Sequence, residues 1–250
     1  MQSVNYNYFL DHFRLLGIKK GDYVVVHSRL ISFGKIEGGI SSVIQALISA
    51  VGPSGSIILP TYTLNLKESD IYDPLITPSI NAGALPEFAR NLNIFERTFS
   101  PLHSHIVFGA NKENILKINP FKSFGENTIF SLMLGLKYKL LLLGCNFNQG
   151  ATYLHQIEAL HGVPYRGYIF LKRLVKLPSQ NVEQVQYEYY ARLQPRIINN
   201  FAFFQEKITQ RSEVKSEKTI LGESFSVELD FLTEFGLKEL KQNPLCLINK

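Results

Sequence analysis

A histidine and a glutamate three residues apart form the pair in this sequence best suited to proton transfer. His155 and Glu158 follow an apolar run, residues 139–143, and a short polar loop. Residues three apart share one face of a helix, so the carboxylate can reach the imidazole or a neighbouring donor. Histidine is the usual proton acceptor near neutral pH, and open α/β sheets keep their sites at strand ends. The pair therefore predicts general-base chemistry beside a strand end.

Other interpretations of these residues stay open at this point. His155 could be a hydrogen-bonded packing residue, and Glu158 could face solvent instead of orienting it. Three carboxylates nearer the C-terminus could orient the imidazole equally well: Glu206, Glu223 and Glu228. Cys145 follows the same apolar run, but a thiol in that position is more often a small buried apolar residue than a nucleophile.

The composition is that of a globular protein. The chain has 250 residues, of which 45% are hydrophobic and 19% charged, which excludes a disordered chain. No apolar run approaches the roughly 20 residues of a membrane span, and the first residues lack the pattern of a signal peptide. The two cysteines, Cys145 and Cys246, predict no disulfide framework, so a cytoplasmic location is the simplest interpretation.

The net charge of +5 favours anionic partners. The basic residues are scattered, with no long Lys/Arg block and no nucleic-acid motif. We therefore expect phosphorylated small molecules as partners, and neither nucleic acid nor a membrane. A basic but inert surface is the alternative.

The hydrophobic pattern predicts alternating strands and helices. Buried strands are expected at residues 23–26, 56–59, 104–108 and 139–143. Helices are expected at residues 5–17, 38–51 (with Ser41 or Ser42 as its cap), 84–90, 112–118, 128–136 and 226–242. Further β structure is expected at residues 168–177 and 184–190. This order predicts the α/β class, with a mostly parallel central sheet and helices on both faces.

Polar segments follow the first two strands and could hold a ligand. Residues 27–30 offer backbone amides and hydroxyls to an anionic group, and glycines at 34, 38 and 39 allow close backbone approach before a helix. Residues 61–63 place three hydroxyls at the next strand end. Neither a Walker nor a dinucleotide-binding motif is present, and ordinary loops without a ligand are the alternative.

Several short motifs follow one another along the chain. They are Leu16–Gly34, Gly38–Gly39, Leu59–Thr63, Gly83–Arg90, Arg97–Ser104, Phe124–Asn127, Leu141–Gly144, Thr152–Glu158 and Val163–Arg166. In this order they resemble the aminoglycoside 3-N-acetyltransferase family. The resemblance implies an α/β/α core with a smaller added region, transfer of an acyl group from coenzyme A to a sugar amine, no metal, and His155 as the catalytic base.

The resemblance also implies contacts for both substrates. The expected contacts of acyl-CoA are His27, Ser28, Arg29, Leu30, Ser32, Thr61, Thr63, Ser100, His103 and Ser104. The expected contacts of the acceptor are Tyr62, Asn146, Asn148, Tyr165 and Arg166. Ser100 stands where the family commonly has a histidine, and Asn146 where it often has an acidic residue. His103 and His105 have the spacing of metal ligands on a strand, but no third ligand is evident.

These departures bear on the acceptor. Aminoglycosides are polycations that an acidic cleft attracts, whereas this chain is net positive and carries Asn146 at a family-acidic position. We therefore expect a coenzyme A-dependent N-acyltransferase acting on a nucleotide-linked amino sugar, with an aminoglycoside antibiotic as the alternative. A thioester or amide hydrolase and an inactive binding protein are further alternatives.

The motifs also predict a domain organisation, because most of them lie in the first two thirds of the chain. Residues 1–167 are expected to form the α/β core with the acyl-CoA site and the catalytic histidine. Residues 168–250 are expected to form a smaller α+β lobe packed on that core, and its final helix can return to the core. A homodimer is compatible with this organisation.

Overall fold

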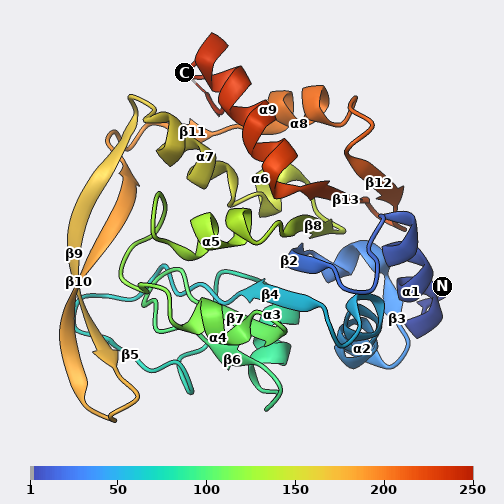
Figure 1. The fold of residues 1–250 in the computed structure, drawn as a ribbon, viewed down its shortest axis with the longest axis horizontal. Coiled ribbons are helices and arrows are strands. Elements are labelled where there is room, and N and C mark those ends of the chain that lie inside the picture. The colour runs from blue at the N-terminus through green and yellow to red at the C-terminus, as the bar shows by residue number, and fades with distance from the viewer. Residues whose placement is uncertain (1–2, 250) are drawn as a thin grey trace.

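A mixed seven-stranded sheet forms the centre of the molecule in the computed structural model, which describes residues 3–249 (Figure 1). The strand order is β12-β13-β8-β2-β4-β7-β6. Its strands are β2 (Tyr23–Ser28), β4 (Ser56–Pro60), β6 (Glu96–Arg97), β7 (His105–Gly109), β8 (Lys139–Leu143), β12 (Lys215–Lys218) and β13 (Glu223–Glu228). Strands β8, β2 and β4 run parallel, and the flanking strands pair antiparallel. The α/β class is confirmed, and parallel pairing holds for the three central strands.

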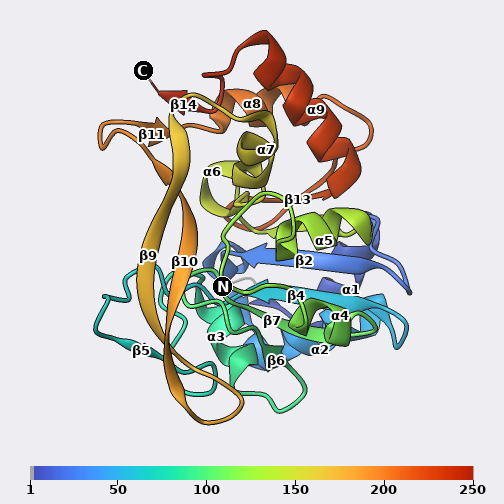
Figure 2. The same ribbon diagram turned by 60° about the vertical axis from the view of Figure 1, so that its left-hand side comes forward.

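Helices cover both faces of this sheet (Figure 2). One face is covered by α1 (Tyr6–Leu15), α2 (Gly39–Val51) and α3 (Ala84–Arg90). The other is covered by α4 (Lys112–Leu116), α5 (Ile129–Gly135), α6 (Phe147–Gly150), α7 (Leu154–His161), α8 (Ala202–Ile208) and α9 (Leu229–Gln242). Side chains alternate along a strand, so Val24 and Val26 pack in the first core and Val25 in the second.

A long β-hairpin runs along the side of the core (Figures 1 and 2). It consists of β9 (Arg166–Lys176) and β10 (Val182–Arg192), and β9 also pairs with β5 (Ile71–Tyr72). The shorter elements are β1 (Ser3–Val4), the 3-10 turn η1 (Leu30–Phe33), β3 (Lys35–Ile36), β11 (Ile198–Asn199) and β14 (Ile248–Asn249). β11 pairs with β14, which joins the segment after the hairpin to the C-terminal end.

Two local expectations are wrong. The N-cap of α2 is Gly38, not a serine; its φ of 74° is a left-handed conformation that glycine adopts readily, and Ser42 Oγ donates to the Glu37 carbonyl. Residues 226–228 are extended, because β13 pairs with β8, and α9 begins only at Leu229. Pairing with a strand about eighty residues away, which no local pattern shows, decides this segment.

Two strands of the central sheet, β12 and β13, come from the segment after residue 167. The division of the chain at that residue stays a prediction. Among residues 3–249, no helix has the length and apolar character needed to cross a membrane.

Candidate active site

A cavity of about 460 Å³ opens where the three parallel strands end. Its wall includes His27, Ser28 and Arg29 at the end of β2, Pro60 and Tyr62 at the end of β4, and Cys145 just after β8. The opposite side consists of His155 on α7 and side chains of the hairpin. Carboxyl ends of parallel strands meet at one edge of a sheet, which explains why segments far apart in the sequence form one cavity.

His155 lies in this wall between two hydrogen-bond partners. Its Nδ1 is 2.6 Å from Oε2 of Glu158, and its Nε2 is 3.3 Å from the amide nitrogen of Asn199. The carboxylate can only accept, so Nδ1 donates to it, and the amide nitrogen can only donate, so Nε2 accepts. The imidazole therefore keeps its basic lone pair on Nε2.

Glu158 is fully buried, and two hydrogen bonds and one ion pair reach its carboxylate. The Tyr165 hydroxyl donates to Oε1 at 2.7 Å, and Arg166 Nε lies 2.8 Å from Oε2. Arg166 also donates to the amide oxygen of Asn199 at 2.8 Å, which closes a ring of contacts around His155. The alternative that Glu158 faces solvent is therefore excluded.

Burial and charge act in opposite directions on this pair. Burial lowers the pKa of His155 below its usual value, although Glu158 opposes the shift. Burial by itself would raise the pKa of Glu158, but His155 and Arg166 outweigh it, and the net pKa of this carboxyl lies below its usual value. The pair is therefore a neutral imidazole on an ionised carboxylate near neutral pH.

Four of the residues expected at the acyl-CoA site line the cavity: His27, Ser28, Arg29 and His103. Burial lowers the pKa of His27 to about 4 and that of His103 to about 3. Ser28 Oγ is buried and has no hydrogen-bond partner among residues 3–249. Two imidazole rings whose pKa is lowered by burial therefore line the cavity together with Ser28 and Arg29.

The other expected acyl-CoA contacts are occupied within the protein. Ser32 donates to the Gly144 carbonyl at 2.6 Å, Thr63 to the Pro101 carbonyl at 2.7 Å and Ser100 to the Tyr187 hydroxyl at 3.4 Å. Leu30 packs against the core beneath α1 and α2. These side chains do not line the cavity.

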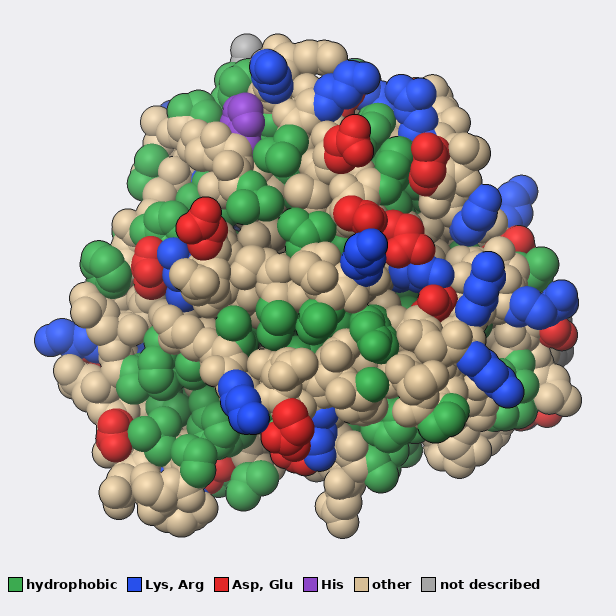
Figure 3. Space-filling view, viewed as in Figure 1, with side chains coloured by type: hydrophobic (Ala, Val, Ile, Leu, Met, Phe, Trp, Pro, Cys, Tyr) green, Lys and Arg blue, Asp and Glu red, His purple; other side chains and the backbone are tan. Residues whose placement is uncertain are grey.

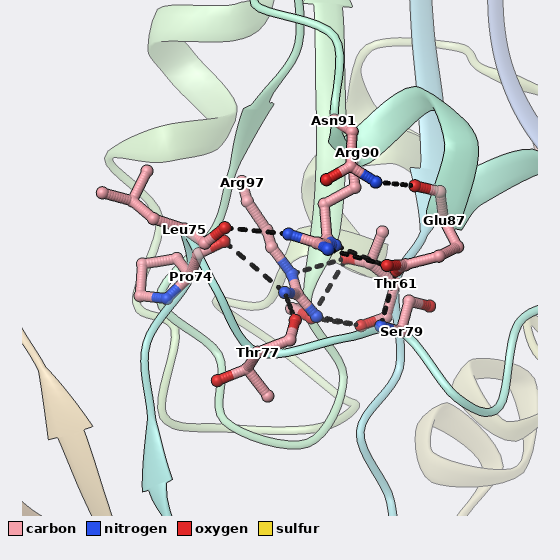
Figure 4. Close-up of polar contacts among 10 residues, drawn as sticks. Thr61, Pro74, Leu75, Thr77, Ser79, Glu87, Arg90, Asn91 and Arg97 are labelled. Carbon is pink, nitrogen blue, oxygen red and sulfur yellow. Dashed lines mark hydrogen bonds and ion pairs between the residues drawn. The ribbon is translucent and has the colours of Figure 1, made fainter.

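Thr61 and Ser104 accept hydrogen bonds from the buried side chain of Arg97. Figure 4 shows Arg97 among Thr61, Pro74 and Thr77. Arg97 donates to the Thr61 carbonyl at 2.6 Å, to both hydroxyls at 3.0 and 3.1 Å, and to the carbonyl of Thr77. Arg90 holds the same loop through the Leu75 carbonyl at 2.8 Å. The loop contributes Tyr62 to the cavity wall, whereas the two arginines do not line the cavity. They therefore hold the loop that carries Tyr62 in place.

The residues expected to contact the acceptor are divided by the structure. Tyr62 and Arg166 line the cavity. Asn146 caps α6 by accepting from the Gln149 amide, and it lines an adjoining hollow that shares Arg29 and Cys145 with the cavity. The other two have internal partners: Asn148 accepts from the Phe201 amide at 2.6 Å, and Tyr165 donates to Glu158.

Sequence reasoning missed Asn199 and Arg192, which both line the cavity. Asn199 lies in the two-residue strand β11, and no motif surrounds it. Its position beside His155 depends on the pairing of β11 with β14, so the sequence carried no local signal for it. Within residues 3–249, no cluster of three or more His, Cys, Asp or Glu is placed to hold a metal ion.

A comparison with known protein families shows which family the chain belongs to. A profile of the aminoglycoside 3-N-acetyltransferase family matches residues 25–241. The chain belongs to this family. The resemblance seen in the sequence motifs is thereby confirmed, and the matched residues include the whole cavity wall described above.

Individual relatives agree with this assignment. The chain is similar to the SPbeta prophage-derived aminoglycoside N(3')-acetyltransferase-like protein YokD of Bacillus subtilis (strain 168), with 30% identity over 181 residues. That match covers 64% of this chain and 65% of the relative, which is less than two thirds of its length. The chain is also 26% identical over 186 residues to aminoglycoside N(3)-acetyltransferase IX of Micromonospora chalcea, covering 67% of the chain and 66% of that protein.

Solved structures show the same fold over nearly the whole chain. The aminoglycoside acetyltransferase AAC(3)-IIb superposes with a TM-score of 0.84 at 18% identity, covering 97% of this chain and 98% of that one.

Proposed function

We propose that this protein transfers an acyl group from coenzyme A to the amino group of an amino sugar, with His155 as the general base. The observation that carries the proposal is the geometry of His155. Its Nδ1 is held by a buried carboxylate, and its Nε2, whose partner is the Asn199 amide, lies in the wall of a cavity large enough for a reacting group. Coenzyme A as donor is supported by a solved structure of the same fold, AAC-IIIb with CoASH, which has a TM-score of 0.82 at 21% identity.

The reaction needs one proton acceptor and one proton donor. The amine lone pair attacks the thioester carbonyl carbon while Nε2 of His155 takes a proton from the nitrogen. Glu158 stabilises the imidazolium that forms. The carbon–sulfur bond then breaks, and the imidazolium returns the proton to the thiolate. The products are an amide and free coenzyme A, and His155 is neutral again.

The ends of β2 and β4 are the proposed position of acyl-CoA. Arg29 donates to Ser32 Oγ at 3.1 Å and has no carboxylate partner among the described residues, so its charge is available to a phosphate. Ser28 Oγ has unused hydrogen-bonding capacity next to it. The acceptor would then approach from the side of the hairpin, between Arg166 and Asn146.

An aminoglycoside is the acceptor that the relatives favour. One solved structure of this fold, AAC-VIa bound to sisomicin, has a TM-score of 0.81 at 18% identity. A nucleotide-linked amino sugar is the second candidate, and one observation favours it. Three arginines line the cavity (Arg29, Arg166 and Arg192), of which Arg166 is paired with the buried Glu158, and the lining includes no aspartate or glutamate among the described residues. A polycation would find no counter-charge there.

The overall charge does not settle this choice. On the face in Figure 3, Lys and Arg side chains gather toward the edge where α1 and β12 lie, and hydrophobic side chains gather toward the opposite lower side. The Lys and Arg side chains are thus unevenly spread over this face. The lining of the cavity, and not the total charge, is the relevant quantity for the acceptor.

The test is a mass-spectrometric assay of acyl transfer. Acetyl-CoA and longer acyl-CoAs would be offered with a panel of aminoglycosides and nucleotide-linked amino sugars. His155→Ala is expected to bind acyl-CoA as before and to lose transfer by at least about 10²-fold. Thiol release without any amine would indicate a hydrolase, and unchanged transfer by His155→Ala would refute the role of the histidine.

A further inference from the structure

His103 is a second imidazole in the cavity wall, and aromatic rings hold it in place. The ring centroids of Tyr62, Phe124 and Tyr189 lie 5.2, 5.1 and 5.8 Å from that of His103. Only 6% of the residue is exposed. Burial, with a smaller contribution from the neighbouring His155, lowers the pKa of His103 to about 3. The ring is therefore neutral and fixed in orientation at working pH.

A hydrogen-bond chain behind the ring sets its tautomer. Ser100 Oγ donates to the hydroxyl of Tyr187 at 3.4 Å, and that hydroxyl lies 3.0 Å from Nδ1 of His103. The Tyr187 oxygen accepts from Ser100, and we assign its own hydrogen to the bond with Nδ1 of His103, an assignment that nitrogen-15 NMR can check. The ring proton is then on Nε2, which has no hydrogen-bond partner in the described part of the chain.

His103 and His155 flank the same stretch of the cavity. Both line it, and the ring of Phe124 makes an edge contact with each, with centroids 5.1 Å from His103 and 5.7 Å from His155. One imidazole presents a lone pair and the other an N–H group. This is the combination that an addition to a carbonyl requires, because one atom loses a proton while another gains negative charge.

We propose that the Nε2–H of His103 donates a hydrogen bond to the thioester carbonyl oxygen and stabilises the oxyanion of the tetrahedral intermediate. The inference rests on the acyl transfer proposed above. As the amine lone pair forms the carbon–nitrogen bond, the carbonyl π pair moves onto oxygen, where His103 holds it. The pair returns when the carbon–sulfur bond breaks. His155 takes the amine proton and passes it to sulfur, and His103 keeps its own proton throughout.

The kinetic test compares three variants. His103→Phe keeps the aromatic packing and removes the donor, and we expect kcat to fall by about 10²–10³-fold with the KM for acyl-CoA changed less than about threefold. Tyr187→Phe keeps the aromatic ring and removes the hydroxyl that fixes the tautomer of His103, so a fall in kcat of about tenfold is expected. His161→Phe is the matched control, because His161 lies on α7 outside the cavity, and it is expected to behave as the wild type.

A second readout does not depend on turnover. Nitrogen-15 NMR of the wild type is expected to show His103 neutral and protonated on Nε2 between pH 5 and 8, and Tyr187→Phe to mix the two tautomers. An Nδ1–H tautomer, or an unchanged kcat in His103→Phe, overturns the proposal, as does a loss confined to the KM for acyl-CoA. If melting curves show that His103→Phe does not fold, an unchanged kcat in Tyr187→Phe overturns it instead. Wild-type protein that transfers to no amine on the panel refutes the acyl transfer itself, while the NMR result still reports the tautomer.

Discussion

The side-chain amide nitrogen of Asn199 lies 3.3 Å from Nε2 of His155, on the edge of the ring opposite Glu158. This is the nitrogen that would accept the proton of an attacking amine. Asn199 therefore marks the place that the amine would take, and its own amide has to give way there. Arg166 holds the oxygen of the same amide at 2.8 Å, so the orientation of Asn199 is tied to the carboxylate behind the ring.

Replacing Asn199 by aspartate should raise the pKa of His155. A carboxylate beside Nε2 favours the protonated imidazole, in addition to Glu158 at Nδ1. The acidic limb of the kcat/KM–pH profile should move to higher pH by about one unit, with a lower rate at pH 6.5. The pH profile and an NMR titration of His155 would measure this. Asn200→Asp, one residue along and outside the cavity lining, is the control, and an unmoved limb in Asn199→Asp would contradict the geometry.

Glu158→Gln should weaken both the reaction and the fold. Without the carboxylate the imidazolium loses its stabilising charge, so kcat should fall at least about tenfold. The pKa of His155 should fall further, and the acidic limb should move to lower pH.

Arg166, which is buried, is left without a charge partner in Glu158→Gln, at a cost of about 3–5 kcal/mol in the free energy of unfolding. Urea denaturation would measure that cost, with the exposed Glu234→Gln as control. Unchanged stability would mean that the buried pair contributes nothing.

Stability should fall as the pH drops from about 6.5 to about 4. Burial lowers the pKa of both His12 and His27 to about 4, so the unfolded chain binds protons in this range that the folded chain does not. Each such histidine contributes about 3 kcal/mol above its unfolded pKa, which is lost as the pH approaches the folded pKa. His12→Gln keeps a polar partner for Ser224, which lies 2.8 Å from His12, and removes the titration. Melting temperatures against pH should then be flatter for this variant, and identical slopes would count against the assignment.

Arg97→Lys should loosen the cavity wall from behind. A lysine cannot make the forked set of bonds to the Thr61 carbonyl, the two hydroxyls and the Thr77 carbonyl. We expect a loss of about 2–4 kcal/mol in unfolding free energy and a higher KM for acyl-CoA, with a smaller change in kcat. Thermal melts and kinetics would test this against Arg14→Lys, an exposed control. A normal KM together with lower stability would limit Arg97 to a structural role.

Local sequence patterns predicted the elements whose signals lie within a few residues. Helix α3 and strand β8 have the expected bounds, because apolar runs between glycine and polar breaks specify them. The contact between His155 and Glu158 was among the expected possibilities for the same reason. A spacing of three residues brings two side chains together on any helix, whatever surrounds it.

Tertiary structure decided everything that depends on distant segments. Strand β13 belongs to the central sheet because it pairs with β8. Asn199 lies beside His155 because β11, which contains it, pairs with β14. The hydroxyls of Thr61 and Ser104 looked available for a ligand, yet Arg97 uses both. A short sequence window determines on which face of a helix or strand a residue lies. Which residues pack against that face depends on the order of the strands and the packing of the loops, and long-range pairing alone establishes both.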